Sequence, residues 1–225
     1  MLELTQWKRT LSLPDRPWLM LGKGPSFSMR KDFDLTQYNL LSLNHVVRAQ
    51  HVDVAHMIDI DVVEACADEL LQNCRYLVMP RRPHVHCDPG PKLLEDYFEE
   101  LPVLRQLAAE NRLVWYNLSS SAPIGDSPVI GARWFSAEAA LNILALVGAK
   151  QIRSLGIDGG RGYSGEFADL ERQTMLANGH ETFNQQFDEM EAACKRHGIN
   201  YAPLVEPMRV FVGTEWFADV MRDSD

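Results

Sequence analysis

The chain of 225 residues has few of the features that secreted or membrane proteins need. It holds four cysteines, Cys66, Cys74, Cys87 and Cys194. They form neither close pairs nor a regular framework, which is typical of reduced thiols and argues against disulfides. No apolar run reaches the length of a membrane span, and the first residues lack the apolar core of a signal peptide. We therefore expect a soluble, cytoplasmic protein.

Basic residues are also scarce. The 22 lysines and arginines are outnumbered by 31 aspartates and glutamates, which gives a formal net charge of -9. Binding to nucleic acid requires clustered cations that neutralise phosphates, and this chain has them only in short patches. We therefore expect no nucleic-acid partner, whereas a few local cations suffice for a small anionic substrate.

Apolar residues, in contrast, make up 46% of the chain. Short apolar runs alternate with longer stretches of helical spacing, a pattern typical of βα units around a parallel sheet. The runs that predict strands are 18–21, 40–43, 54–58, 76–79, 113–116, 151–157 and 199–204. The stretches that predict helices are 62–73, 92–110, 137–147 and 181–197. We predict one α/β domain over residues 1–225, with a Rossmann-like, doubly wound, mostly parallel sheet and helices on both faces.

Two segments between these elements are predicted to be loops. Residues 81–91 are rich in proline and histidine, and residues 119–131 are rich in serine, proline and glycine. The second segment is a candidate lid over a site at the edge of the sheet. Residues 205–225 carry apolar side chains that predict packing on the domain or a contact between subunits, so a homo-oligomer is one expectation.

A glycine-rich turn follows the first predicted strand and reads Gly22-Lys23-Gly24-Pro25-Ser26. Small residues at such a turn let backbone amides approach a phosphate or a sugar closely. The turn lacks the spacing and the Gly-Lys-Ser/Thr ending of a Walker loop, and it does not complete the dinucleotide fingerprint. Two interpretations stay open: a turn that binds a ligand, or an ordinary tight turn with Lys23 in solvent.

A second glycine-rich stretch ends the predicted strand at 151–157 and reads Gly156-Ile157-Asp158-Gly159-Gly160-Arg161-Gly162-Tyr163. Ser136 precedes it at the start of a helical pattern, where a hydroxyl caps the helix or donates to an anion, and Arg133 can reach the same place. His180 follows it at another helix start. There the helix dipole favours the neutral imidazole, so His180 can act as a general base or can cap the helix.

Two further groups of residues have the chemistry of metal ligands. Asp59 and Asp61 follow a strand with the Asp-x-Asp spacing in which carboxylates hold a divalent ion that bridges a nucleotide diphosphate. Residues 84–88 contain histidine, cysteine and aspartate, but no distant pair completes a tetrahedral set. A common acidic turn and a surface loop are the alternative interpretations, and we predict no metal in the site.

In order along the chain, these motifs resemble those of the small bacterial sialyltransferases of glycosyltransferase family 42 and of relatives that share their nucleotide-binding domain. The resemblance runs from about residue 18 to residue 204. The family's Gly-Asn-Gly-Pro-Ser turn corresponds to residues 22–26, with Lys23 in place of the asparagine. The next strand of the family ends in a sequence whose asparagine corresponds to Asn44.

The second half of the chain matches with the better spacing. The family's Arg-x-x-Ser, Gly-Ile-Asp and Gly-His motifs correspond to residues 133–136, 156–158 and 179–180. Tyr163 corresponds to one of two tyrosines that contact the departing phosphate in the family, and Gly160 stands at the position of the other.

The resemblance implies an inverting glycosyltransferase that moves an acidic sugar from a CMP donor to a hydroxyl of a glycan or glycolipid acceptor. It implies that His180 is the general base and that Tyr163 donates to the leaving phosphate. The residues that it assigns to donor binding are Gly22, Gly24, Pro25, Ser26, Asn44, Asp59, Arg133, Ser136, Asp158, Gly159 and Arg161. It implies no cofactor, because CMP carries only one phosphate.

Two alternatives stay open within the same set of relatives. One is a hydroxymethylpterin pyrophosphokinase, which needs magnesium held by carboxylates, and here Asp59, Asp61 and Asp158 would be the ligands. The other is a non-catalytic protein that has kept the fold and the nucleotide site. Fold analogy alone does not separate these three functions.

Overall fold

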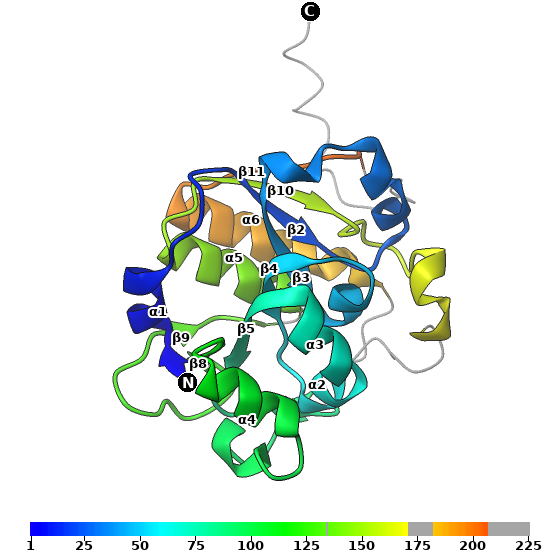
Figure 1. The fold of residues 1–225 in the computed structure, drawn as a ribbon. Coiled ribbons are helices and arrows are strands. Elements are labelled where there is room, and N and C mark those ends of the chain that lie inside the picture. The colour runs from blue at the N-terminus through cyan, green and yellow to red at the C-terminus, as the bar shows by residue number, and fades with distance from the viewer. Residues whose placement is uncertain (134, 171–181, 207–225) are drawn as a thin grey trace, which may run out of the picture.

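The computed structural model describes residues 1–133, 135–170 and 182–206. Within these ranges the chain forms an α/β fold, in which helices flank a nine-stranded sheet on both faces (Figure 1). The strand pairs of this sheet are parallel. The predicted Rossmann-like fold is therefore confirmed. No helix in the described ranges is long and apolar enough to cross a membrane.

The strand order indicates where a ligand-binding crevice is expected. The strands are β1 (Leu2–Glu3), β2 (Trp18–Leu21), β3 (Asn39–Leu43), β4 (Val52–His56), β5 (Cys74–Pro80), β8 (Leu113–Leu118), β9 (Val129–Ile130), β10 (Gln151–Leu155) and β11 (Asn200–Pro203). They lie in the order β1-β8-β5-β4-β3-β2-β10-β11, with β9 beside β8. The chain adds β3, β4, β5 and β8 on one side of β2 and then returns to place β10 on the other side. Open α/β sheets bind ligands at the carboxyl ends of the strands where the order reverses, here between β2 and β10.

Helices cover the two faces of the sheet. The α-helices are α1 (Leu4–Thr10), α2 (Ile60–Ala65), α3 (Ala67–Asn73), α4 (Pro102–Ala109), α5 (Ser136–Leu146) and α6 (Gln186–His197). Because side chains alternate along a strand, Trp18 and Met20 of β2 pack in one core with α1, α5 and α6. Leu19 and Leu21 pack in the other core with α2, α3 and α4. All four side chains are buried, which explains why this strand is a continuous apolar run.

The predicted strands are confirmed, with small differences at their ends. The strand predicted at 18–21 is β2, and the other six correspond to β3, β4, β5, β8, β10 and β11 within two residues at each end. The four cysteines are free, as the spacing predicted.

Three of the four predicted helices are shorter than expected. The helix predicted at 62–73 is broken at Cys66, whose backbone (φ -123°, ψ 19°) leaves the helical region between α2 and α3. In the stretch 92–110 a 3-10 helix, η4 (Leu94–Tyr97), precedes α4, which begins at Pro102. Likewise, η7 (Phe183–Gln185) precedes α6. In the first two stretches apolar spacing continues through the interruption, because the separate helices bury their side chains in the same core.

Both predicted loops contain short strands. Residues 81–91 form a hairpin of β6 (His84–Val85) and β7 (Asp88–Pro89). In 119–131, β9 pairs with β8, and the Asn117 amide donates to the carbonyl oxygens of Ile124 and Ser127 at 3.1 and 2.8 Å. A lid function of this loop stays a prediction. Of the C-terminal segment, residues 207–225 lie outside the described residues, and Val205 packs against the core.

The buried pair of His56 and Tyr116 makes the stability of this sheet depend on pH. His56 lies in β4, its Nε2 is 2.8 Å from the Tyr116 hydroxyl, and complete burial lowers the pKa of His56 to about 3. In the unfolded chain the pKa is about 6.5. Between these values the unfolded state binds more protons, so stability is lost as the pH falls from about 6.5 towards 3, with a limiting slope of about 1.4 kcal/mol per pH unit.

We expect His56→Gln to remove this slope, because the amide does not titrate yet can still bond to the Tyr116 hydroxyl. Urea unfolding between pH 7 and pH 4 would measure it. Between pH 6 and pH 4, the free energy of unfolding of the variant should fall less steeply than that of the wild type, by about 1.4 kcal/mol per pH unit. Equal slopes for the two proteins would show that His56 is not kept neutral in the folded state.

Candidate functional site

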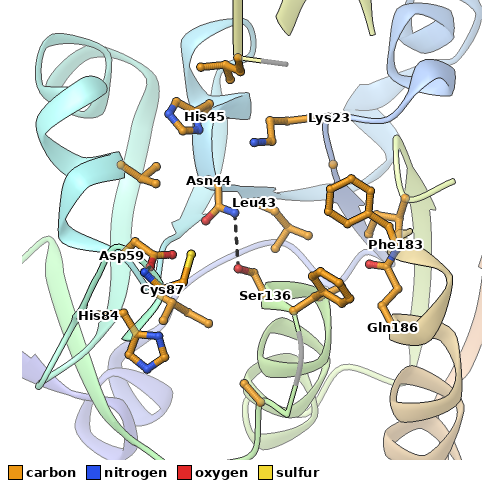
Figure 2. A pocket seen from close by; sticks show the side chains of 18 of the residues that line it. Lys23, Leu43, Asn44, His45, Asp59, His84, Cys87, Ser136, Phe183 and Gln186 are labelled. Carbon is orange, nitrogen blue, oxygen red and sulfur yellow. Dashed lines mark hydrogen bonds between the residues drawn. The ribbon is translucent and has the colours of Figure 1, made fainter. Parts of the chain in front are cut away.

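A cavity of about 1090 Å³ opens at the carboxyl edge of the sheet, where β2 and β10 meet (Figure 2). This volume is at the upper end for small-molecule sites, and it is large enough for a nucleotide-linked sugar. The walls come from the turns after β2, β3, β4 and β10, from the β6–β7 hairpin and from the start of α5. Of the residues predicted for the site, the cavity is lined by Gly22, Gly24, Asn44, Asp59, Arg133, Ser136, Asp158, Gly159 and Tyr163.

The turns after β2 and β10 contact each other through their backbones. The Gly22 amide donates to the carbonyl oxygen of Leu155, and the Gly24 amide donates to that of Gly156, both at 2.8 Å. A Cβ atom on Gly22 would overlap the Gly156 carbonyl oxygen, and one on Gly24 would lie 2.5 Å from Asp158 Oδ2. Glycine is therefore required at 22 and 24 by this close approach, whatever ligand the site binds.

Ser26 and Asp158 fasten the same two turns. The Ser26 amide donates to Asp158 Oδ2 at 2.7 Å, its hydroxyl donates to Oδ1 at 2.5 Å, and the hydroxyl oxygen accepts from the Gly156 amide at 2.8 Å. Pro25 has no amide hydrogen. The backbone amides of Gly24 and Ser26 are thus already used within the protein and are not free to donate to a ligand.

Asn44 and Ser136 form a polar pair on the cavity wall (Figure 2). Asn44 follows β3 with a left-handed backbone (φ 53°), and its amide donates to the Ser136 hydroxyl at 3.4 Å. Ser136 begins α5, but Phe135 is the N-cap and makes no side-chain cap, so the capping interpretation of the serine is not what the structure shows. Among the described residues, the buried Asn44 Oδ1 has no hydrogen-bond donor. It is thus available to a donor group of a ligand.

Carboxylates hold the β6–β7 hairpin against the opposite wall. The turn residues His86 and Cys87 have left-handed backbones (φ 50° and 70°), and their amides donate to Asp61 at 2.8 Å and to Asp59 at 3.1 Å. Burial raises the pKa of Asp59 and lowers that of His84, which also lines the cavity. In the described ranges, no three His, Cys, Asp or Glu side chains are grouped as a metal site would require.

Aromatic rings form a third side of the cavity. Phe183 lies between Tyr163 and Phe135, with ring centroids 5.8 and 5.3 Å apart. Such rings offer flat apolar surfaces on which a base or a sugar face can stack. Phe135 and Phe183 were not predicted for the site, because they lie far apart in the sequence and only the fold brings them together.

The remaining predicted residues differ in their placement. Arg133 lines the cavity and pairs with Glu189, with Nη1 to Oε1 at 3.0 Å. Arg161 is exposed and, like Pro25 and Ser26, is not part of the cavity lining. Gly160 ties the loop to the segment before α6, because its carbonyl oxygen accepts from the Phe183 amide at 2.8 Å. His180 lies outside the described residues.

Fold and site together define a Rossmann-like α/β protein with a ligand cavity at its switch point. No family model matches the chain, and no curated protein matches it in sequence. Among solved structures, the monofunctional alpha-2,3-sialyltransferase Cst-I from Campylobacter jejuni is similar, with a TM-score of 0.54 and 10% identity over 86% of this chain and 78% of that chain. A variant of the sialyltransferase CST-II in complex with CMP is also similar, with a TM-score of 0.51 and 11% identity over 86% of this chain and 83% of that chain. At these identities the likeness concerns the fold, and at that level it supports the resemblance found in the motifs.

Proposed function

We propose that this protein is an inverting glycosyltransferase that moves an acidic sugar from a CMP donor to a hydroxyl of a glycan or glycolipid acceptor. The observation that carries the proposal is the cavity at the switch point, in a fold that resembles sialyltransferase structures. The motifs that suggested this function from sequence supply the turns after β2 and β10 at the edge of that cavity.

The chemistry of the cavity suits such a donor. CMP-linked acidic sugars combine one phosphate and one carboxylate with a base and a polar ring. The cavity offers cationic side chains, an unsatisfied amide oxygen on Asn44 and the rings of Phe135, Tyr163 and Phe183. Cations pair with phosphate and carboxylate, and aromatic rings stack on a base or on the apolar face of a sugar.

Within this proposal the predicted residues take two kinds of role. Asn44, Arg133 and Ser136 contact the donor, and Tyr163 donates to the leaving phosphate as the bond to the sugar breaks. His180 removes the proton of the acceptor hydroxyl. The turn residues shape the edge of the site and hold it rigid: Gly22, Gly24, Pro25, Ser26, Asp158 and Gly159.

If the protein were a pyrophosphokinase, Asp59, Asp61 and Asp158 would be the ligands of magnesium. In the structure these carboxylates accept hydrogen bonds from the amides of Cys87, His86 and Ser26, respectively. Through these bonds the carboxylates hold the turns after β2 and β10 together and hold the β6–β7 hairpin in place. The transferase is therefore the function that the geometry supports better.

A binding panel tests the proposal. Calorimetry would compare CMP, UDP, GDP and ATP, each in EDTA and in magnesium. We expect CMP to bind best, with the same affinity in EDTA, because a single phosphate needs no divalent ion. Binding of ATP that is lost in EDTA would instead support the pyrophosphokinase, and no binding of CMP would contradict the proposal.

A further inference from the structure

Lys23 is the cation of the turn after β2, and its side chain points into the cavity. Figure 2 shows its ammonium directed towards His45, above the pair of Asn44 and Ser136. The Lys23 Nζ atom lies 4.6 Å from the centroid of the Tyr163 ring. The sequence left open whether this lysine lies in solvent, and the structure shows that it lines the cavity and is partly buried.

Unlike its cationic neighbours, Lys23 has no carboxylate of its own. Arg30 pairs with Glu166 at 2.5 Å, and Arg48 pairs with Asp169 at 3.0 Å. In the part of the chain that the structure describes, Lys23 makes no ion pair and no side-chain hydrogen bond. An ammonium that is partly desolvated and unpaired costs free energy, and an anion bound beside it would offset that cost.

The polar groups next to Lys23 do not provide a positive charge for an anion. The amides of Gly24 and Ser26 donate within the protein and Pro25 has no amide hydrogen, so residues 24–26 offer no free backbone donor to an anion. His45 lines the cavity beside it and is only 6% exposed, and its Nδ1 has no hydrogen-bond partner among the described residues. Burial, together with Lys23 and Arg48, lowers the pKa of His45 to about 4, so this ring is neutral near pH 7.

We propose that Lys23, with His45 beside it, is the anion-binding subsite of this cavity and takes the phosphate or the carboxylate of the ligand. The inference rests on the proposed function in one respect, since that function makes the ligand a donor that carries both groups. The ammonium forms charge-assisted hydrogen bonds with the anionic oxygens, and the neutral His45 ring supplies a further polar contact.

The charged state of this subsite depends on pH. Burial lowers the pKa of Lys23 to about 8, and the nearby acidic groups oppose the effect only in part. The titratable and charged groups that face Lys23 are His45, Arg48, Asp59, Cys66 and Asp169, with the Tyr163 ring beneath the ammonium. Above pH 8 the empty site loses the proton that anion binding requires. The affinity for an anion should therefore fall by up to about tenfold per pH unit above pH 8.

The same charge should lower the stability of the free protein. Because the folded pKa of Lys23 is below its unfolded value of 10.5, stability rises as the pH increases from about 8 towards 10.5. Lys23→Met keeps an unbranched, flexible side chain that is one atom shorter, and it removes the charge. We expect this variant to melt at a higher temperature than the wild type at pH 7, and to lack the rise above pH 8. A lysine with a merely structural role would give a lower melting temperature in the variant.

The deciding experiment is calorimetry of the wild type, Lys23→Met and Lys23→Arg with four probes: CMP, cytidine, a free acidic sugar and inorganic phosphate. We expect Lys23→Met to lower the affinity for CMP about 10- to 100-fold and to leave the affinity for cytidine unchanged. Lys23→Arg should keep CMP binding at pH 7 and lose the decline above pH 8, because arginine does not deprotonate there. If Lys23→Met binds CMP with unchanged affinity but binds the acidic sugar more weakly, the carboxylate is the group that Lys23 binds.

The outcomes separate this inference from the proposed function. If the wild type binds CMP and Lys23→Met binds CMP and the acidic sugar equally well, the subsite is wrong and the proposed function stands. If the wild type binds no nucleotide, the proposed function fails and inorganic phosphate decides the subsite. Phosphate binding that Lys23→Met weakens would keep the subsite, and phosphate binding that is absent or unchanged in the variant would overturn it.

Discussion

Gly22→Ala is expected to lower the free energy of unfolding by about 3 kcal/mol and to abolish ligand binding at the cavity. The added Cβ would overlap the carbonyl oxygen of Gly156, which is backbone and cannot rotate away. Relief requires the turns after β2 and β10 to move apart, which breaks the bonds from the Gly22 and Gly24 amides. Gly156→Ala meets the Gly22 carbonyl oxygen in the same way and adds the strain of a left-handed backbone (φ 74°).

Urea unfolding followed by circular dichroism would measure this loss, and Gly165→Ala is the matched control. Gly165 lies in the 3-10 helix η5 (Gly165–Leu170), its backbone is not left-handed, and a Cβ there would meet no atom within 4 Å. That control should change stability by less than about 1 kcal/mol. If Gly22→Ala unfolds at the same urea concentration as Gly165→Ala, the two turns do not approach as closely as the structure has them.

His180→Ala is expected to reduce kcat about 100- to 10,000-fold while CMP still binds, because a general base acts on the acceptor and not on the nucleotide. The expectation rests on the Gly-His motif at residues 179–180, since His180 lies outside the described residues. Steady-state transfer with CMP-sialic acid and a panel of glycan acceptors would give kcat, and calorimetry would give the affinity for CMP.

His51→Ala serves as the control for this variant. His51 is exposed and is not part of the cavity lining, so its removal should leave both quantities unchanged. If His180→Ala transferred the sugar as fast as His51→Ala, the base would have to be another residue. If instead it lost CMP binding, His180 would belong to the nucleotide site.

The sheet could be predicted from the sequence because its central strands are buried on both faces. Such strands appear as short apolar runs with clear ends, and β2 was predicted to the residue at 18–21. The break at Cys66 could not be predicted, because α2 and α3 both send their apolar side chains into one core. The first strand and helix, β1 and α1, could not be predicted either, because β1 has only two residues and no apolar run of its own.

Those residues of the candidate site that lie in the turns after strands could be placed at the cavity from the sequence. Gly22, Asn44 and Asp158 follow β2, β3 and β10, and a parallel sheet brings the carboxyl ends of its strands to one edge. The opposite wall was not predictable, because contacts between segments far apart in the sequence hold the β6–β7 hairpin there, among them the bonds of Asp59 and Asp61 to its turn. Spacing also did not reveal that the amides of Gly24 and Ser26 donate within the protein.

Whether the protein is a transferase would show most clearly in the turnover of CMP-sialic acid by the purified wild-type protein in EDTA, followed by nuclear magnetic resonance with acceptor glycans present. We predict that CMP is released without a divalent ion, and that the first product has the anomeric configuration opposite to that of the donor. If the wild-type protein binds CMP but releases it from the donor no faster than His180→Ala does, the proposed transferase activity is wrong and the protein binds nucleotide without transferring a sugar.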